Sequence, residues 1–123
     1  MTDVRERIER VWDDDIVPRL EEYIRIPNVS KAYEPQWREL GHMARAVDHI
    51  RNWCAARRIA GLTVEVIELP GLTPMIVMEV PPFAGGSTKG PDDVVLLYGH
   101  LDKQPEMEGW REGFGPWTPV IEN

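Results

Sequence analysis

The stretch of sequence that decides the fold is Val94-Val95-Leu96-Leu97-Tyr98, and Gly99-His100-Leu101-Asp102 follows it directly. An uninterrupted apolar run of this length is typical of a central strand that is covered on both faces of a sheet. In open α/β sheets, ligands bind at the outer ends of such strands. Because side chains two residues apart in extended backbone share a face, His100 and Asp102 should project together at this end.

Two helices are predicted before this strand. Apolar residues recur at steps of three and four over residues 3–24, and again over residues 36–60. Pro18 interrupts the first pattern, and because proline is tolerated only in the first turn of a helix, we expect a break or restart near residues 14–15. Gly61 is free to adopt a positive φ and is the expected end of the second helix.

A hairpin and a loop are predicted between the helices and the central strand. Residues 63–69 and 75–80 are strand candidates, and the segment 70–74 between them contains the Pro and Gly residues of a turn. Residues 84–93 are rich in Gly, Ser and Pro and predict a surface loop. Two helices, a hairpin and a central strand together indicate the α/β class.

Length and charge narrow the class of protein. The chain has 123 residues and a net charge of −7, which suits one domain of ordinary size. Residues 1–61 carry 11 basic and 11 acidic side chains, whereas residues 62–123 carry 3 and 10. The acidic half would repel nucleic-acid phosphates and anionic lipids, so we expect no nucleic acid and no membrane as partner. The sequence has a single cysteine, Cys54, and contains neither an apolar run of membrane-spanning length nor a signal-peptide pattern. We therefore expect a cytoplasmic protein.

His100 and Asp102 are the candidate site residues. A neutral imidazole is a good zinc ligand, and a carboxylate beside it can orient the ring and raise its basicity. A His-x-Asp tripeptide is weak evidence by itself, because an ordinary surface histidine at a strand end has the same sequence. His42 and His49 are too far apart along one helix to share an ion, and Cys54 lies on an apolar stripe, so it is expected to be buried and inert.

A longer pattern points to a known family. Residues 99–105 (Gly-His-Leu-Asp-Lys-Gln-Pro), 109–110 (Gly-Trp) and 115–119 (Gly-Pro-Trp-Thr-Pro) form this pattern. It resembles the zinc metallopeptidase family of carnosine dipeptidase, aminoacylase and succinyl-diaminopimelate desuccinylase, and the dipeptidase branch most closely. Residues 23–30 (Tyr-Ile-Arg-Ile-Pro-Asn-Val-Ser) and 69–74 (Leu-Pro-Gly-Leu-Thr-Pro) extend the resemblance over nearly all of the chain.

The resemblance implies both a fold and a reaction. Residues 1–123 would be the N-terminal portion of a three-layer α/β peptidase domain. His100 would bind one of two zinc ions, and Asp102 would be the catalytic carboxylate that holds this histidine and tunes the metal. The complete enzyme would hydrolyse small peptides or N-acyl amino acids through metal-activated water, with a glutamate as general base.

The same resemblance places the remaining parts of the enzyme beyond Asn123. These parts are the bridging aspartate, the glutamate pair, the later ligands and a lid domain that usually provides dimer contacts. A catalytic zinc site needs three protein ligands, whereas this chain matches one. Glu106, Glu108 and Glu112 match no ligand position of the family. The isolated chain is therefore expected to be inactive.

Two other functions remain open. One is a non-catalytic, truncated module that associates with another chain through its open sheet edge. The other is a lone metal-binding protein, for which a single histidine predicts only weak zinc binding. A folded, monomeric chain would favour an independent module, whereas aggregation would favour part of a larger domain.

Overall fold

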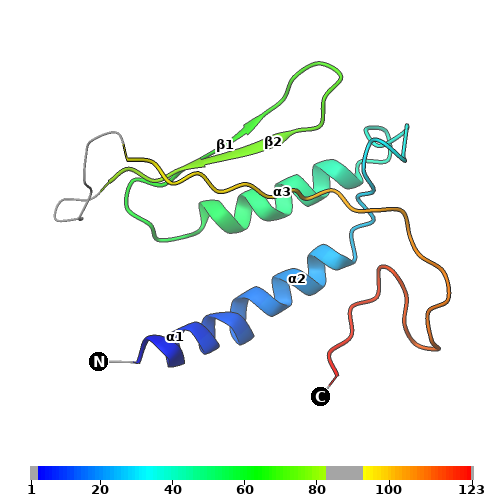
Figure 1. Ribbon diagram of the computed structural model, residues 1–123, viewed down its shortest axis with the longest axis horizontal. Coiled ribbons are helices and arrows are strands. Elements are labelled where there is room, and N and C mark those ends of the chain that lie inside the picture. Colours follow the sequence, from blue (N-terminus) through cyan, green and yellow to red (C-terminus); the bar gives the residue numbers. More distant parts are fainter. Residues whose placement is uncertain (1–2, 83–92, 123) are drawn as a thin grey trace.

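The computed structural model describes residues 3–82 and 93–122 and shows a mixed α/β chain (Figure 1). Its elements, in order, are α1 (Val4–Val11), the π-helical turn η1 (Trp12–Ile16), α2 (Val17–Ile24), α3 (His42–Ala55), β1 (Thr63–Ile67) and β2 (Met75–Glu79). In Figure 1, α3 lies between the β1–β2 hairpin and the helix formed by α1, η1 and α2. The loop predicted at 84–93 falls outside the described residues, apart from Asp93.

The N-terminal helix runs without a gap from α1 to α2 and contains a π-helical turn where the sequence predicts a break. Asp3 caps its start, since the Asp3 side chain accepts a hydrogen bond from the Arg5 amide at 3.1 Å. In η1, the Val17 amide donates to the Trp12 carbonyl, five residues earlier. Pro18 therefore lies in the first turn of α2, the part of a helix that tolerates proline. A local change of helix type therefore accommodates the proline.

The second helix begins later than predicted. Residues 36–40 form a separate turn, in which the Leu40 amide donates to the Gln36 carbonyl at 3.0 Å. Gly41 follows with a φ of 72°, a left-handed conformation that interrupts the helical path, and α3 begins at His42. The prediction of one helix from residue 36 was therefore wrong, because residues 36–40 form a turn and Gly41 separates this turn from α3.

The second helix also ends earlier than predicted. The Arg57 side chain donates to the Trp53 carbonyl at 2.9 Å, and the Arg57 amide donates to the Cys54 carbonyl at 3.0 Å. These bonds satisfy carbonyls of the last turn, so the helix closes at Ala55. Gly61 has the expected positive φ, 75°, but it lies in the turn before β1.

The predicted hairpin is confirmed. β1 and β2 are antiparallel, with Val64 opposite Met78 and Ile67 opposite Met75. The turn between them contains Gly71, whose φ is 73°. β1 is the strand of the hairpin that contacts α3.

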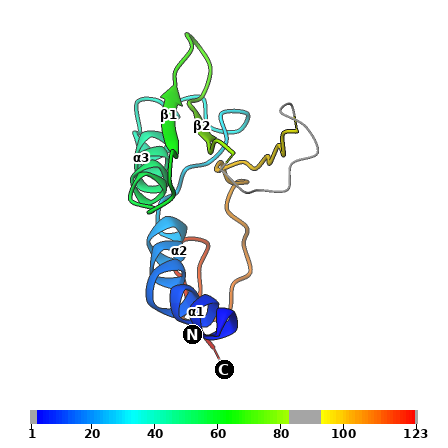
Figure 2. The same ribbon diagram turned by 90° about the vertical axis from the view of Figure 1, so that its left-hand side faces the viewer.

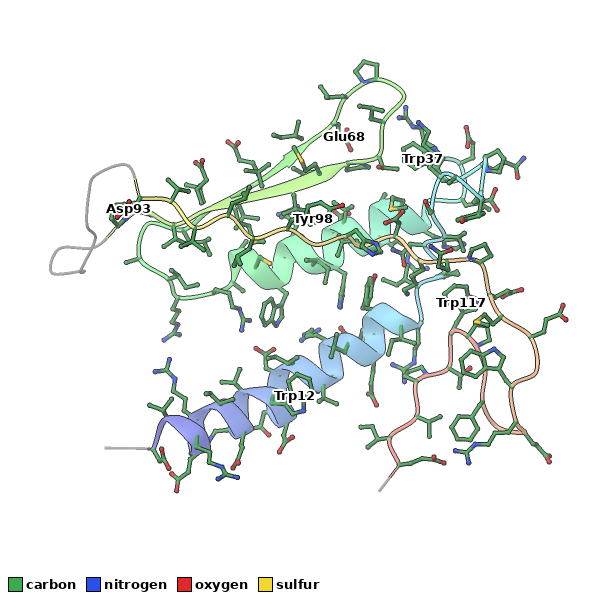
Figure 3. The ribbon with its side chains drawn as sticks, in the orientation of Figure 1. Trp12, Trp37, Glu68, Asp93, Tyr98 and Trp117 are labelled. Atoms are coloured by element: carbon green, nitrogen blue, oxygen red, sulfur yellow. The ribbon has the colours of Figure 1, made fainter. Side chains whose placement is uncertain are left out.

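Residues 94–98 do not form the predicted central strand. β1–β2 is the only sheet in the described part of the chain, and no backbone hydrogen bond there joins residues 94–98 to another segment. The five side chains are 84–91% exposed. Figure 2 shows the segment beyond β2, and Figure 3 shows Tyr98 on it. A central strand needs neighbouring backbone to pair with and covering layers for its side chains, and the described residues provide neither.

The buried residues belong to α3 and to the segment that follows α2. They are Ile26, Asn28, Met43, Ala46, Val47 and Cys54. Cys54 is buried as predicted, and burial raises the pKa of its thiol. No helix within residues 3–82 and 93–122 is long and apolar enough to cross a membrane.

Candidate metal centre

Two segments that are far apart in the sequence meet near the end of α2. Val29 and Lys103 form a parallel β-bridge. The Lys103 amide donates to the Asn28 carbonyl at 3.0 Å, and the Ser30 amide donates to the Lys103 carbonyl at 2.8 Å. The segments 23–30 and 99–105, which carry much of the family pattern, therefore lie side by side (Figure 1).

Two polar side chains hold the backbone between His100 and Asp102. The Leu101 carbonyl accepts hydrogen bonds from the Asn28 side-chain amide, at 2.8 Å, and from the Tyr23 hydroxyl. Asn28 is only 1% exposed, so its hydrogen bond is shielded from competing water. Burial raises the pKa of Tyr23 above its ordinary value, which keeps the hydroxyl a donor.

His100 and Asp102 meet as their spacing predicts. His100 Nδ1 lies 2.9 Å from Asp102 Oδ1 and 3.1 Å from the Asp102 carbonyl oxygen. When Nδ1–H donates to these oxygens, Nε2 keeps the lone pair that a metal ion takes. The His100 side chain is 69% exposed, so Nε2 is within reach of an ion, whereas the Asp102 side chain is 37% exposed.

The Ser30 side chain is the largest cause of the lowered pKa of Asp102. A hydrogen bond with the Ser30 side chain holds the pKa of Asp102 below its ordinary value of 3.8, and the bond with His100 adds to this effect. Partial burial of Asp102 acts in the opposite direction. The carboxylate is therefore ionised at neutral pH, and a carboxylate in this position raises the basicity of a metal-binding imidazole.

Tyr23, Asn28 and Ser30 are site residues to which the sequence patterns assign no role. One local signal was present, because Asn28 and Ser30 alternate with Val29 directly after Pro27. Alternating polar residues in an extended segment share a face. This signal identifies a polar edge, but it does not reveal that residues 100–103 lie against it.

The other two histidines lie apart from this pair. His49 Nε2 is 3.0 Å from the Arg19 carbonyl, and its Nδ1 is 3.7 Å from the Glu22 carboxylate, so His49 joins α3 to α2. His42 is the first residue of α3. Both are partly exposed.

The C-terminal tryptophans have contacts of their own. The Trp117 indole donates to the Glu106 carboxylate at 3.0 Å, and its ring centroid is 5.3 Å from Lys103 Nζ. Trp110 donates to the Met107 carbonyl at 2.6 Å. Figure 3 shows Trp117 close to the end of α2. Glu106 is thus the partner of an indole.

The described residues provide one candidate zinc ligand, His100, but not a complete zinc site. A catalytic zinc usually has three protein ligands. Within residues 3–82 and 93–122, no group of three or more His, Cys, Asp or Glu side chains is placed to hold a metal ion. The His100–Asp102 pair has the donor chemistry of a single ligand with its orienting carboxylate.

Comparison with protein-family models and with curated proteins finds no match to this chain.

Proposed function

We propose that the chain is the N-terminal part of a zinc-dependent metallopeptidase or amidohydrolase of the dipeptidase-like family. The observation that carries the proposal is the His100–Asp102 pair, with 2.9 Å between His100 Nδ1 and Asp102 Oδ1, next to Ser30. The pair combines an exposed imidazole with an ionised carboxylate, which is the chemistry of a histidine ligand and its orienting group. The meeting of segments 23–30 and 99–105 adds support, because each belongs to the family pattern.

Each residue has a defined part in this proposal. His100 binds the metal through Nε2, and Asp102 accepts the Nδ1 proton, which fixes the tautomer and the ring orientation. A hydrogen bond with the Ser30 side chain lowers the pKa of Asp102 from its ordinary value, which is already well below neutral pH. When bound, zinc in such a site activates water for attack on an amide carbonyl. The proposed substrates are small peptides or N-acyl amino acids.

The proposal also explains why we expect the isolated chain to have no turnover. One histidine ligand leaves at least two protein ligands to be supplied by other residues, and the described residues contain no such group. The general base must come from elsewhere as well. The exposed apolar residues 94–98 and the apolar face of α1, with Val4 at 71% and Ile8 at 63% exposure, are consistent with part of a larger three-layer domain.

A second candidate function is supported by the open hairpin and by residues 94–98. The hairpin has two strands, so each has one edge without a partner among the described residues. A non-catalytic module would pair such an edge, or the extended segment 94–98, with a strand of another chain. Light scattering distinguishes the candidates in part, because a folded, monomeric 123-residue chain that keeps an unpaired edge favours an independent module.

The enzymatic proposal is tested on the protein encoded when the reading frame is followed in full beyond codon 123. We expect this protein to hydrolyse dipeptides with zinc bound, and His100→Ala to lower kcat/KM by at least about 10²-fold, the scale for a group central to a catalytic site. His49→Ala is the matched control, because His49 contacts Arg19 and Glu22 and lies outside the pair. Unchanged activity in His100→Ala would refute the proposal.

A further inference from the structure

The Lys103 side chain binds the carbonyls at the end of α2. Its Nζ donates to the carbonyls of Ile26 at 2.6 Å, Tyr23 at 2.7 Å and Ile24 at 3.3 Å. The last carbonyls of a helix have no partner within the helix, and the helix dipole favours a positive charge beside them. Lys103 Nζ also lies 4.1 Å from the centroid of the Tyr23 ring, a cation–π distance.

The main chain of Lys103 binds the next segment. Its amide and carbonyl pair with Asn28 and Ser30, at 3.0 and 2.8 Å. Lys103 is therefore attached twice, through its ammonium group to the end of α2 and through its backbone to residues 28–30. Asp102 precedes it directly, and the Asp102 carboxylate lies 2.9 Å from His100 Nδ1.

Residues 99–105 have no helix or strand of their own to hold them. Their position depends on contacts with other segments, and the contacts of Lys103 are the most numerous of these. We propose that Lys103 is a positioning residue, whose ammonium group at the end of α2 holds residues 100–103 against residues 28–30, which places Asp102 and thereby directs His100. The placement of Asp102 by Lys103 is independent of the function proposed above. Any effect of Lys103 on metal binding rests on that function.

Lys103 keeps its positive charge in this position at neutral pH. Burial lowers the pKa of Lys103 to about 8, so at neutral pH the ammonium form that donates to the three carbonyls still predominates. A partly buried lysine that lost these acceptors would move towards water. The contacts and the charge therefore favour a single location for the side chain.

The test uses nuclear magnetic resonance on the metal-free 123-residue chain. Lys103→Met keeps the length of the side chain and removes the cation. We expect the amides of Ser30 and Lys103, which form the hydrogen bonds between the two segments, each to exchange with solvent at least about tenfold faster. The matched control is Lys31→Met, since the exposed Lys31 binds the Gly71 carbonyl in a different part of the chain. The control should change neither quantity.

Two results would overturn the proposal. One is a folded Lys103→Met chain in which both quantities stay at their wild-type values. The other is a loss of protection that includes the β1–β2 amides, because Lys103 would then support the whole fold instead of this segment. Neither measurement involves zinc, so a failure of zinc to bind His100 would refute the proposed function and leave the positioning role of Lys103 intact.

Discussion

Replacing Tyr23 by phenylalanine removes one hydroxyl from the candidate site and leaves the ring in place. The hydroxyl donates to the Leu101 carbonyl, which also accepts the Asn28 amide at 2.8 Å. The carbonyl therefore stays paired in the variant, and the ring stays available to the Lys103 ammonium. The expected loss is that of one intramolecular hydrogen bond, about 1 kcal/mol of unfolding free energy.

Urea denaturation followed by circular dichroism measures this loss. With a slope of about 2 kcal/mol per molar urea, the midpoint should fall by about 0.5 M. Tyr33→Phe is the matched control, because Tyr33 is 57% exposed, and it should stay within about 0.5 kcal/mol of wild type. If Tyr23→Phe is as mild as this control, the Leu101 carbonyl is not held from α2 as described.

A double-mutant cycle makes the same test more specific. Tyr23 and Asn28 bind one carbonyl oxygen. The losses caused by Tyr23→Phe and Asn28→Ala should therefore depart from additivity by at least about 0.5 kcal/mol. Additive losses would indicate that the two side chains act on separate parts of the structure.

Two further predictions concern titration and reactivity. The folded pKa of Asp102 lies below 3.8, so its contribution to stability is present above that pH and is lost as the pH falls through the folded pKa. Asp102→Asn should therefore show a smaller fall of the urea midpoint between about pH 5 and pH 2 than wild type, and an equal fall would contradict the hydrogen bonding of this carboxylate. Cys54 is 7% exposed and its thiol pKa is raised by burial, so a thiol reagent should label the folded chain at least about 10²-fold more slowly than the urea-unfolded chain. Equal labelling rates would contradict the position of Cys54 in the core.

Local patterns predicted the features that depend on neighbouring residues. The hairpin follows from two strand-like runs around a Pro- and Gly-containing turn, and its register is observed with Val64 opposite Met78. The approach of His100 to Asp102 follows from their separation of two residues. Both features require little information from the rest of the chain.

The features that depend on distant residues were missed or wrong. A strand at 94–98 requires neighbours on both sides, and the described residues supply none. Ser30 is 72 positions from Asp102, so no local pattern could join them. The bounds of α3 depend on the positive φ of Gly41 and on the Arg57 side chain, which the apolar periodicity does not register.

We propose that His100 binds zinc and that Asp102 orients its ring. The most direct measurement is a zinc titration of the 123-residue chain, with the imidazole nitrogens of its three histidines followed by nuclear magnetic resonance. We expect weak binding, a first change at His100 Nε2 with little change at His42 and His49, and binding that is about 10-fold to 100-fold weaker in Asp102→Asn. An unchanged His100 signal, or a shift of the His42 or His49 nitrogens at lower zinc concentration than His100, would contradict the proposal.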